Sequence, residues 1–124
     1  MLFMSKLGNK NFALLGKMLD LTAEKHRVIA GNISNVNTPN YQRRQYNFDD
    51  SLRYAMENGS VKDYRRVEGW ISRPKTTPVR NNGNNVDIDL EMLNMRENSS
   101  YYNIITDFYN SKSKMVKKAI SGGN

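Results

Sequence analysis

Two long stretches of helical periodicity, one toward each end of the chain, constrain the fold more than any other feature. In each, apolar side chains recur every three or four positions, from about residue 11 to 36 and again from 87 to about 120. This spacing places the side chains on one face of an α-helix. The residues that we expect to pack in helix–helix contacts or in assembly are Leu15, Leu19, Ile29, Ile33, Leu90, Tyr101, Ile104, Phe108 and Met115.

We therefore predict a mainly α protein forming a single domain over residues 1–124, with helices at 8–36 and 87–120 that pair as a coiled coil. Leu14 and Met18 widen the apolar face of the first helix beyond a two-stranded seam, so more than one neighbour is implied. Asp87 follows a breaker-rich Asn and Gly run and is the predicted N-cap of the second helix. Acidic residues in its first turn and lysines in its last turns complement the helix dipole.

The middle region, residues 37–85, has no sustained period and is predicted to be irregular, short-stranded or partly disordered. A short helical turn is expected around 49–57, because apolar residues cluster there before the Asn58-Gly59 break. Beyond that break, one or two short strands are expected from Tyr64, Val67, Trp70 and Ile71.

A polar turn connects the first helix to the middle region. Pro39 fixes its own φ and disfavours the helical region for Thr38, while Asn40 is one of the few non-glycine residues that readily accept a positive φ. This combination meets the requirements of a type II turn. The turn residues form a motif with the helix end before them, made of Asn32, Asn35, Thr38, Pro39, Asn40 and Tyr41.

Composition limits the classes of protein that the chain can belong to. The net charge is +7 and the mean hydropathy is −0.74, which indicates attraction to acidic surfaces and an elongated or assembly-dependent fold. Cysteine is absent, so disulfides and thiolate metal sites are excluded. The first ten residues show no signal-peptide pattern, and no apolar run is long enough for a transmembrane helix.

No constellation of residues predicts catalysis. His26 is the only histidine and falls on the apolar face, so we expect it to serve packing and not metal binding. No glycine pattern resembles a phosphate-binding loop. We predict a protein that is not an enzyme, with no catalytic, cofactor-binding or metal-binding residues. Basic pairs with nearby aromatic residues could bind a nucleic-acid strand, namely Arg43-Arg44 and Arg65-Arg66 with Tyr41, Tyr46, Tyr64 and Trp70.

The segment from Asn32 to Tyr41 resembles the N-terminal signature of bacterial flagellar rod, hook and hook–filament junction proteins. The usual form of that signature is Ala-Asn-Asn-Leu/Ile-Ala-Asn-x-x-Thr-Pro-Gly-Tyr, followed by basic residues. The chain departs from it at Gly31, Ser34 and Asn40. The block Asn84–Met92 is similar to the Asn-x-Val-Asp-x-Asp-x-Glu-Met block of the proximal rod proteins within this family. The last helix lacks the Gln-x-x-Tyr/Phe-x-x-Asn signature of the other axial proteins.

The resemblance implies a structural subunit of the proximal rod of the flagellar basal body. Members of the family pair their terminal helices and assemble helically with other axial proteins into the hollow drive shaft used in motility. It also implies export by the flagellar type III apparatus without a cleaved signal peptide, a place in the periplasmic space, and partners among rod, export-gate and basal-body components. No small-molecule substrate or cofactor is implied. The alternatives are a small basic nucleic-acid-binding protein, or another axial rod component such as FlgC.

Overall fold

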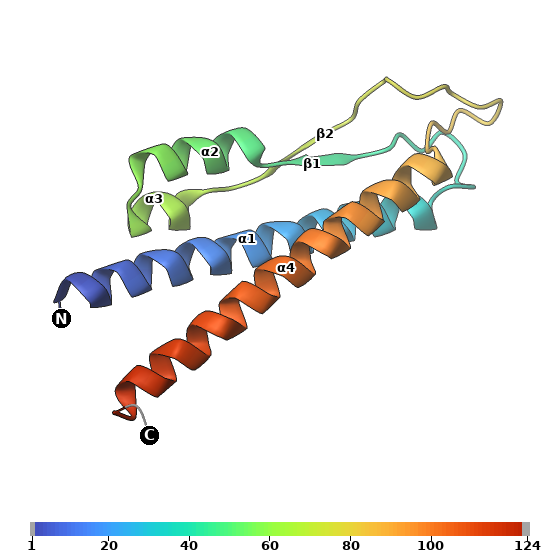
Figure 1. Cartoon of the computed structure of the whole chain (residues 1–124). Helices are drawn as coiled ribbons and strands as arrows, with labels where there is room; N and C mark the ends of the chain where they lie inside the picture. The colour runs from blue at the N-terminus through green and yellow to red at the C-terminus, as the bar shows by residue number, and fades with distance from the viewer. Residues whose placement is uncertain (1, 123–124) are drawn as a thin grey trace.

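The chain folds into two long helices from its two ends, with a small helical and stranded insert between them (Figure 1). The computed structural model describes residues 2–122, and the side chains from residue 10 onward. The elements, in chain order, are α1 (Leu2–Ser34), β1 (Gln45–Asn47), α2 (Asp49–Asn58), α3 (Val61–Arg66), β2 (Trp70–Ser72) and α4 (Ile88–Ile120). The prediction of a mainly helical fold with long terminal helices is confirmed.

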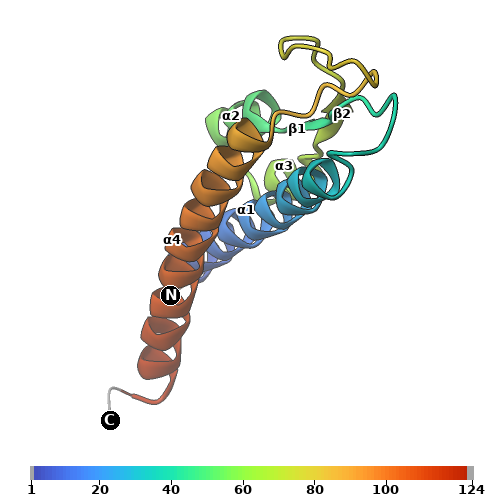
Figure 2. The same cartoon turned by 90° about the vertical axis from the view of Figure 1, so that its right-hand side faces the viewer.

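Helices α1 and α4 pack against each other in opposite directions (Figures 1 and 2). Their contact includes an edge-to-face pair between Phe12 and Tyr109, with ring centroids 5.3 Å apart. Farther along, the Asn98 side-chain amide donates a hydrogen bond of 2.8 Å to the carbonyl oxygen of Thr22. Ile29 and Ile105 are the most buried apolar residues of the two helices outside the core described next. The helix pair is therefore held by both apolar and polar contacts.

The main hydrophobic core lies between α1 and the layer formed by α2 and α3. Leu21 supplies the α1 side of this core, and Leu52, Ala55, Tyr64 and Val67 supply the other side. All five are at most 9% exposed. Burial of apolar area on this scale is the dominant stabilising term in a small domain. The α2–α3 layer covers one flank of α1, while α4 packs on another.

The middle region is more ordered than the sequence pattern predicts. The expected helical turn at 49–57 is present as α2, and Gly59 ends it in the left-handed conformation with φ of 72°. The expected strand around Tyr64 is wrong, because Tyr64 lies within α3 and Val67 is the C-cap of that helix. The physical reason is a local cap: the Ser60 hydroxyl accepts a hydrogen bond from the backbone N–H of Asp63. The spacing of Ser60 and Asp63 is a helix-start signal that the apolar pattern alone does not reveal.

Trp70 and Ile71 do belong to a strand, β2, which pairs with β1 in antiparallel register. Tyr46 lies opposite Ile71, and Asn47 lies opposite Trp70. The Tyr46 ring lies against the backbone of Gly69, where an added Cβ would be 2.1 Å from the ring carbon Cζ. The two-stranded sheet therefore connects the α2–α3 layer to the turn that follows α1.

The helix boundaries differ from the predicted ones. Helix α1 runs from Leu2 to Ser34 instead of 8 to 36, because Gly8 does not interrupt it and because the chain tightens after Ser34. There the backbone N–H of Val36 bonds the carbonyl oxygen of Ile33, three residues back, instead of continuing the α-helical pattern. Helix α4 begins at Ile88, directly after its N-cap Asp87, and ends at Ile120.

The predicted packing residues fall into two groups. Ile29 is buried, and Leu15, Leu19, Ile33 and Leu90 are half-buried. Tyr101, Ile104, Phe108 and Met115 are between 52% and 71% exposed in the single chain, so they do not bury against α1 within it, and their expected part in assembly stays a prediction. The face that α4 turns toward α1 instead carries Glu91, Asn98 and Ile105, one heptad apart. Two of those three residues are polar, which is why an apolar count selects the neighbouring face.

Candidate functional site: the motif junction

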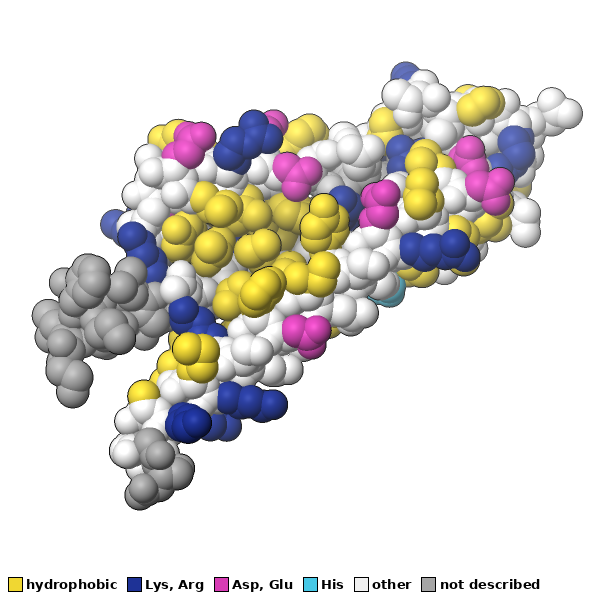
Figure 3. Space-filling model, in the orientation of Figure 1, with side chains coloured by type: hydrophobic (Ala, Val, Ile, Leu, Met, Phe, Trp, Pro, Cys, Tyr) yellow, Lys and Arg dark blue, Asp and Glu magenta, His cyan; other side chains and the backbone are white. Residues whose placement is uncertain are grey.

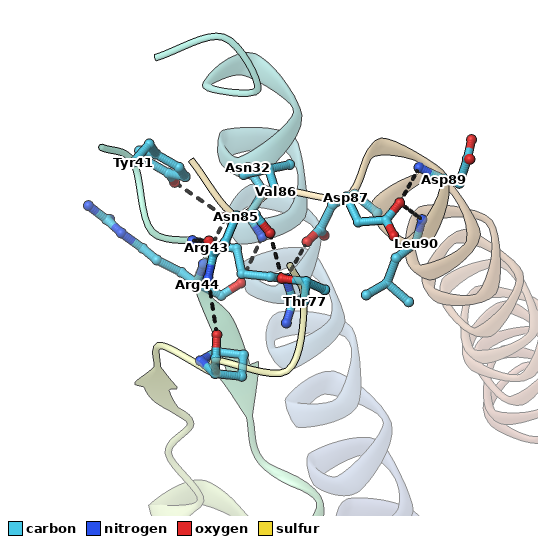
Figure 4. Close-up of polar contacts among 12 residues, drawn as sticks. Asn32, Tyr41, Arg43, Arg44, Thr77, Asn85, Val86, Asp87, Asp89 and Leu90 are labelled. Atoms are coloured by element: carbon cyan, nitrogen blue, oxygen red, sulfur yellow. Dashed lines mark hydrogen bonds and ion pairs between the residues drawn. The ribbon is translucent and has the colours of Figure 1, made fainter. Parts of the chain in front are cut away.

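The two sequence motifs, 32–44 and 84–91, meet at the end of the α1–α4 pair (Figure 4). We call this set of contacts, together with the loop residues 77–83 that bond to it, the motif junction. It joins the exit of α1 to the start of α4 through side chains and backbone groups that are 40 or more positions apart.

The turn at the exit of α1 has the geometry that its residues require. The backbone N–H of Tyr41 donates to the carbonyl oxygen of Thr38 over 3.3 Å, which closes the turn around Pro39 and Asn40. Asn40 has φ of 61°, in the left-handed region that asparagine tolerates. Its N–H donates to the carbonyl oxygen of Asn82 over 2.9 Å, so the turn is attached directly to the loop before α4.

Asn32 fixes the chain that follows the turn. Its Nδ2 donates to the carbonyl oxygen of Arg44 over 2.7 Å, and its Oδ1 accepts from the N–H of Arg44 over 2.9 Å. The Tyr41 hydroxyl also donates to this Oδ1, over 3.3 Å. Asn32 is completely buried. The amide thus pairs with both backbone groups of one residue, as a neighbouring strand would.

Asn84 and Asn85, in the second motif, also use their side-chain amides to bond backbone groups, here those of the first motif. The Asn84 Nδ2 donates to the carbonyl oxygens of Asn35 and Thr38, over 2.8 and 2.9 Å, and so gives each of them a second hydrogen bond beside the one that it accepts from the backbone of the turn. The Asn85 Oδ1 accepts from the backbone N–H of Arg43 over 2.6 Å. Both asparagines are at most 1% exposed. Both side chains are buried and bond backbone groups of the first motif, so they stabilise the junction.

A buried ion pair crosses the junction. The Arg43 Nε donates to the Glu91 Oε1 over 2.7 Å, and the two side chains are 4% and 0% exposed. The second oxygen, Oε2, is buried and has no hydrogen-bond partner among the described residues. Glu91 lies in the first turn of α4, so the pair attaches that turn to the chain leaving α1.

The start of α4 is capped by Asp87, whose Oδ1 accepts from the N–H groups of Asp89 and Leu90 over 3.0 and 3.2 Å. Arg80, which the sequence reasoning did not single out, donates to the carbonyl oxygens of Val36 and Val86. Arg80 makes these bonds only because the loop places it between the two motifs. An arginine in a polar run of sequence gives no sign of such a position.

Two of the basic and aromatic residues that could bind a nucleic-acid strand are buried within the chain. Arg43 is buried in its ion pair, and Tyr64 is only 7% exposed in the hydrophobic core. These two are therefore removed from the set that would contact phosphates and stack on bases.

His26 is exposed in the single chain and so does not pack in its core, and it lines a groove between α1 and α4. Among residues 2–122, no helix is both long and apolar enough to cross a membrane.

Asn32, Arg43, Asn84, Asn85 and Glu91 all bond to other parts of the chain. The junction is therefore an architectural element of a fold built on a pair of terminal helices.

Comparison with known proteins identifies the family. No protein-family model matches the chain. The flagellar basal body rod protein FlgB of Bacillus subtilis strain 168 is 32% identical over 108 residues, which cover 80% of this chain and 84% of that protein. FlgB of Borrelia hermsii is 30% identical over 86% of this chain and 93% of its own length. FlgB of Proteus mirabilis strain HI4320 is 28% identical over 97% and 99%. The chain belongs to the FlgB family of flagellar basal body rod proteins.

Proposed function

We propose that the chain is a subunit of the proximal rod of the flagellar basal body, where it assembles helically with its own copies and with other axial proteins. The family assignment supports the rod, and the arrangement of α4 supports the assembly. In this proposal α1 and α4 form a coiled-coil pair within one domain over residues 1–124, and the assembled shaft is hollow and transmits rotation.

The observation that carries the proposal is the uncovered apolar face of α4. We call it the α4 stripe, and its members are Leu93, Tyr101, Ile104, Phe108 and Met115, each between 52% and 71% exposed. On the face shown in Figure 3, hydrophobic side chains gather between the α2–α3 layer and α4. Contiguous exposed apolar surface of this kind marks an interaction site. A rod subunit needs such a surface to pack against neighbouring subunits.

The proposal includes the route and place that the family resemblance implies. The chain is exported by the flagellar type III apparatus without a cleaved signal peptide and is incorporated in the periplasmic space. Its partners are other rod proteins and components of the export gate and basal body. The relatives named above are FlgB proteins, which supports this position over that of another axial component such as FlgC.

The test is deletion of the gene, imaging of basal bodies, and complementation. Cells without the gene should lack rods, and the unmodified gene should restore them. Phe108→Ser should fail to restore rods while the purified variant unfolds at the same urea concentration as the parent chain, since Phe108 is 62% exposed. Val79→Ser is a matched control, because Val79 is equally exposed but lies in the loop before α4 and is not part of the α4 stripe. Rods in the deletion strain would overturn the proposed function.

A further inference from the structure

Helix α4 carries two open surfaces on opposite sides. One is the α4 stripe. The other is a groove of about 360 Å³ between α1 and α4, with His26 and Arg27 on the α1 side and Ser99, Tyr102 and Asn103 on the α4 side. At about 100° per residue, these three α4 residues project roughly opposite to Tyr101, Ile104 and Phe108. One face of α4 therefore presents protruding apolar side chains, and the opposite face lines the groove.

The polar groups at the floor of the groove already bond to each other and do not require a polar ligand. Asn98 and Thr22 are both about 95% buried, and the Asn98 amide already donates to the Thr22 carbonyl oxygen. Ala23 and the ring of Tyr102 offer apolar contact beside this bond. A groove of this kind suits an aromatic side chain, which is largely apolar and loses little conformational entropy on ordering.

The charges around the two surfaces are complementary. Glu97 is exposed within the stripe, between Leu93 and Tyr101, and makes no ion pair among the described residues. The groove is edged by Arg27 and His26, both exposed. Arg27 contacts Glu24 on its own helix, but its side chain remains 74% exposed, so that pair is weak and easily exchanged. A partner that covers the stripe would remove this glutamate from water, which is unfavourable unless a cation faces it.

We propose that the groove receives the α4 stripe of a second copy of the chain, with Tyr101 and Phe108 entering the groove and Glu97 approaching Arg27. This inference rests on the proposed self-assembly and names the surfaces that perform it. Because stripe and groove are different surfaces on opposite sides of α4, each copy uses one and leaves the other open. Such a heterologous contact propagates into an open-ended assembly, whereas a contact of stripe with stripe would close into a two-fold dimer.

Disulfide cross-linking tests the contact directly, because the chain contains no cysteine of its own. The double variant Ile104→Cys, Ser99→Cys carries one thiol on each surface, and the two cannot bond within one chain because they lie on opposite sides of α4. Under oxidation, both the purified chain at high concentration and rods from complemented cells should give a ladder of dimers, trimers and longer species. Each single variant should give no dimer, and pairing Ser99→Cys with Lys75→Cys, an exposed loop position, should give none.

A charge exchange adds a second measurement. Glu97→Lys should reduce the ladder at least tenfold, and adding Arg27→Glu to the same chain should restore most of it. Dimers from Ile104→Cys alone would show a two-fold contact and overturn the proposal, as would the absence of a ladder in both preparations. If deletion of the gene abolishes rods but no ladder forms, the proposed function stands and this inference fails.

Discussion

The buried ion pair between Arg43 and Glu91 gives the sharpest stability prediction. At 2.7 Å and an effective dielectric constant of about 20, the attraction between the two charges is roughly 6 kcal/mol. Desolvation of each ion opposes this by several kcal/mol, so the net stabilisation by the intact pair is small. Removal of one partner is different, because the other charge then stays buried without compensation. We expect Arg43→Met to lower the free energy of unfolding by about 3–5 kcal/mol.

The measurement is urea unfolding followed by circular dichroism, with a thermal scan beside it. For a chain of this length the loss corresponds to a fall in Tm of roughly 10–20 °C. Arg44→Met is the matched control: the neighbouring side chain is exposed, and the bonds of its backbone to Asn32 are kept, so its effect should stay below about 0.5 kcal/mol.

The double variant Arg43→Met, Glu91→Leu distinguishes the net contribution of the ion pair from the cost of leaving one charge buried without a partner. Replacing both charges by apolar groups removes the uncompensated ion, so its stability should return to within about 1 kcal/mol of the parent chain. The reasoning is refuted if Arg43→Met costs less than about 1 kcal/mol, or if the double variant is as unstable as the single one.

Three further predictions concern the motif junction and are all measured by the midpoint of urea unfolding. Asn40→Gly should change stability little, whereas Asn40→Val should cost about 1–2 kcal/mol because of the positive φ, and equal midpoints would contradict the turn argument. Gly83→Ala should also destabilise, since Gly83 has φ of 83° and its new Cβ would lie 2.2 Å from the Asn40 Oδ1, and an unchanged midpoint would show that the turn relaxes freely. Asp87→Ala should cost about 0.5–2 kcal/mol through loss of the cap of α4, while Asp87→Asn should keep most of the stability.

Features that depend on a few consecutive residues could be predicted from the sequence. The turn at Asn40 and the cap at Asp87 follow from the conformations and hydrogen bonds that those side chains favour locally. The long terminal helices follow from periodicity summed over many residues. The helix α3 was missed because its signal is a single cap, Ser60 with Asp63, in a segment of six residues.

Non-local features could not be predicted. Periodicity shows that α4 has an apolar face, but not which neighbour covers it. The buried face of α4 instead carries Asn98, Glu91 and Ile105. The pairing of Arg43 with Glu91 joins positions 48 residues apart, and each looks like an ordinary surface charge in the sequence. The family block that contains Glu91 was the only signal that could have drawn attention to it.

The structure also explains why the family motifs and the proposed assembly surface consist of different residues: each set has its own role. Asn32, Asn84 and Asn85 are buried and bond backbone groups of the opposite motif, so they determine how α1 and α4 emerge from one end of the molecule. The α4 stripe lies farther along the helix and takes its direction from that junction. Small changes of angle at the junction are amplified along a helix of 33 residues, which is about 50 Å long. A shaft built from many copies needs every subunit to present its stripe at the same angle. A polar junction with many hydrogen bonds, at the end where the two helices meet, is a physical means of achieving this.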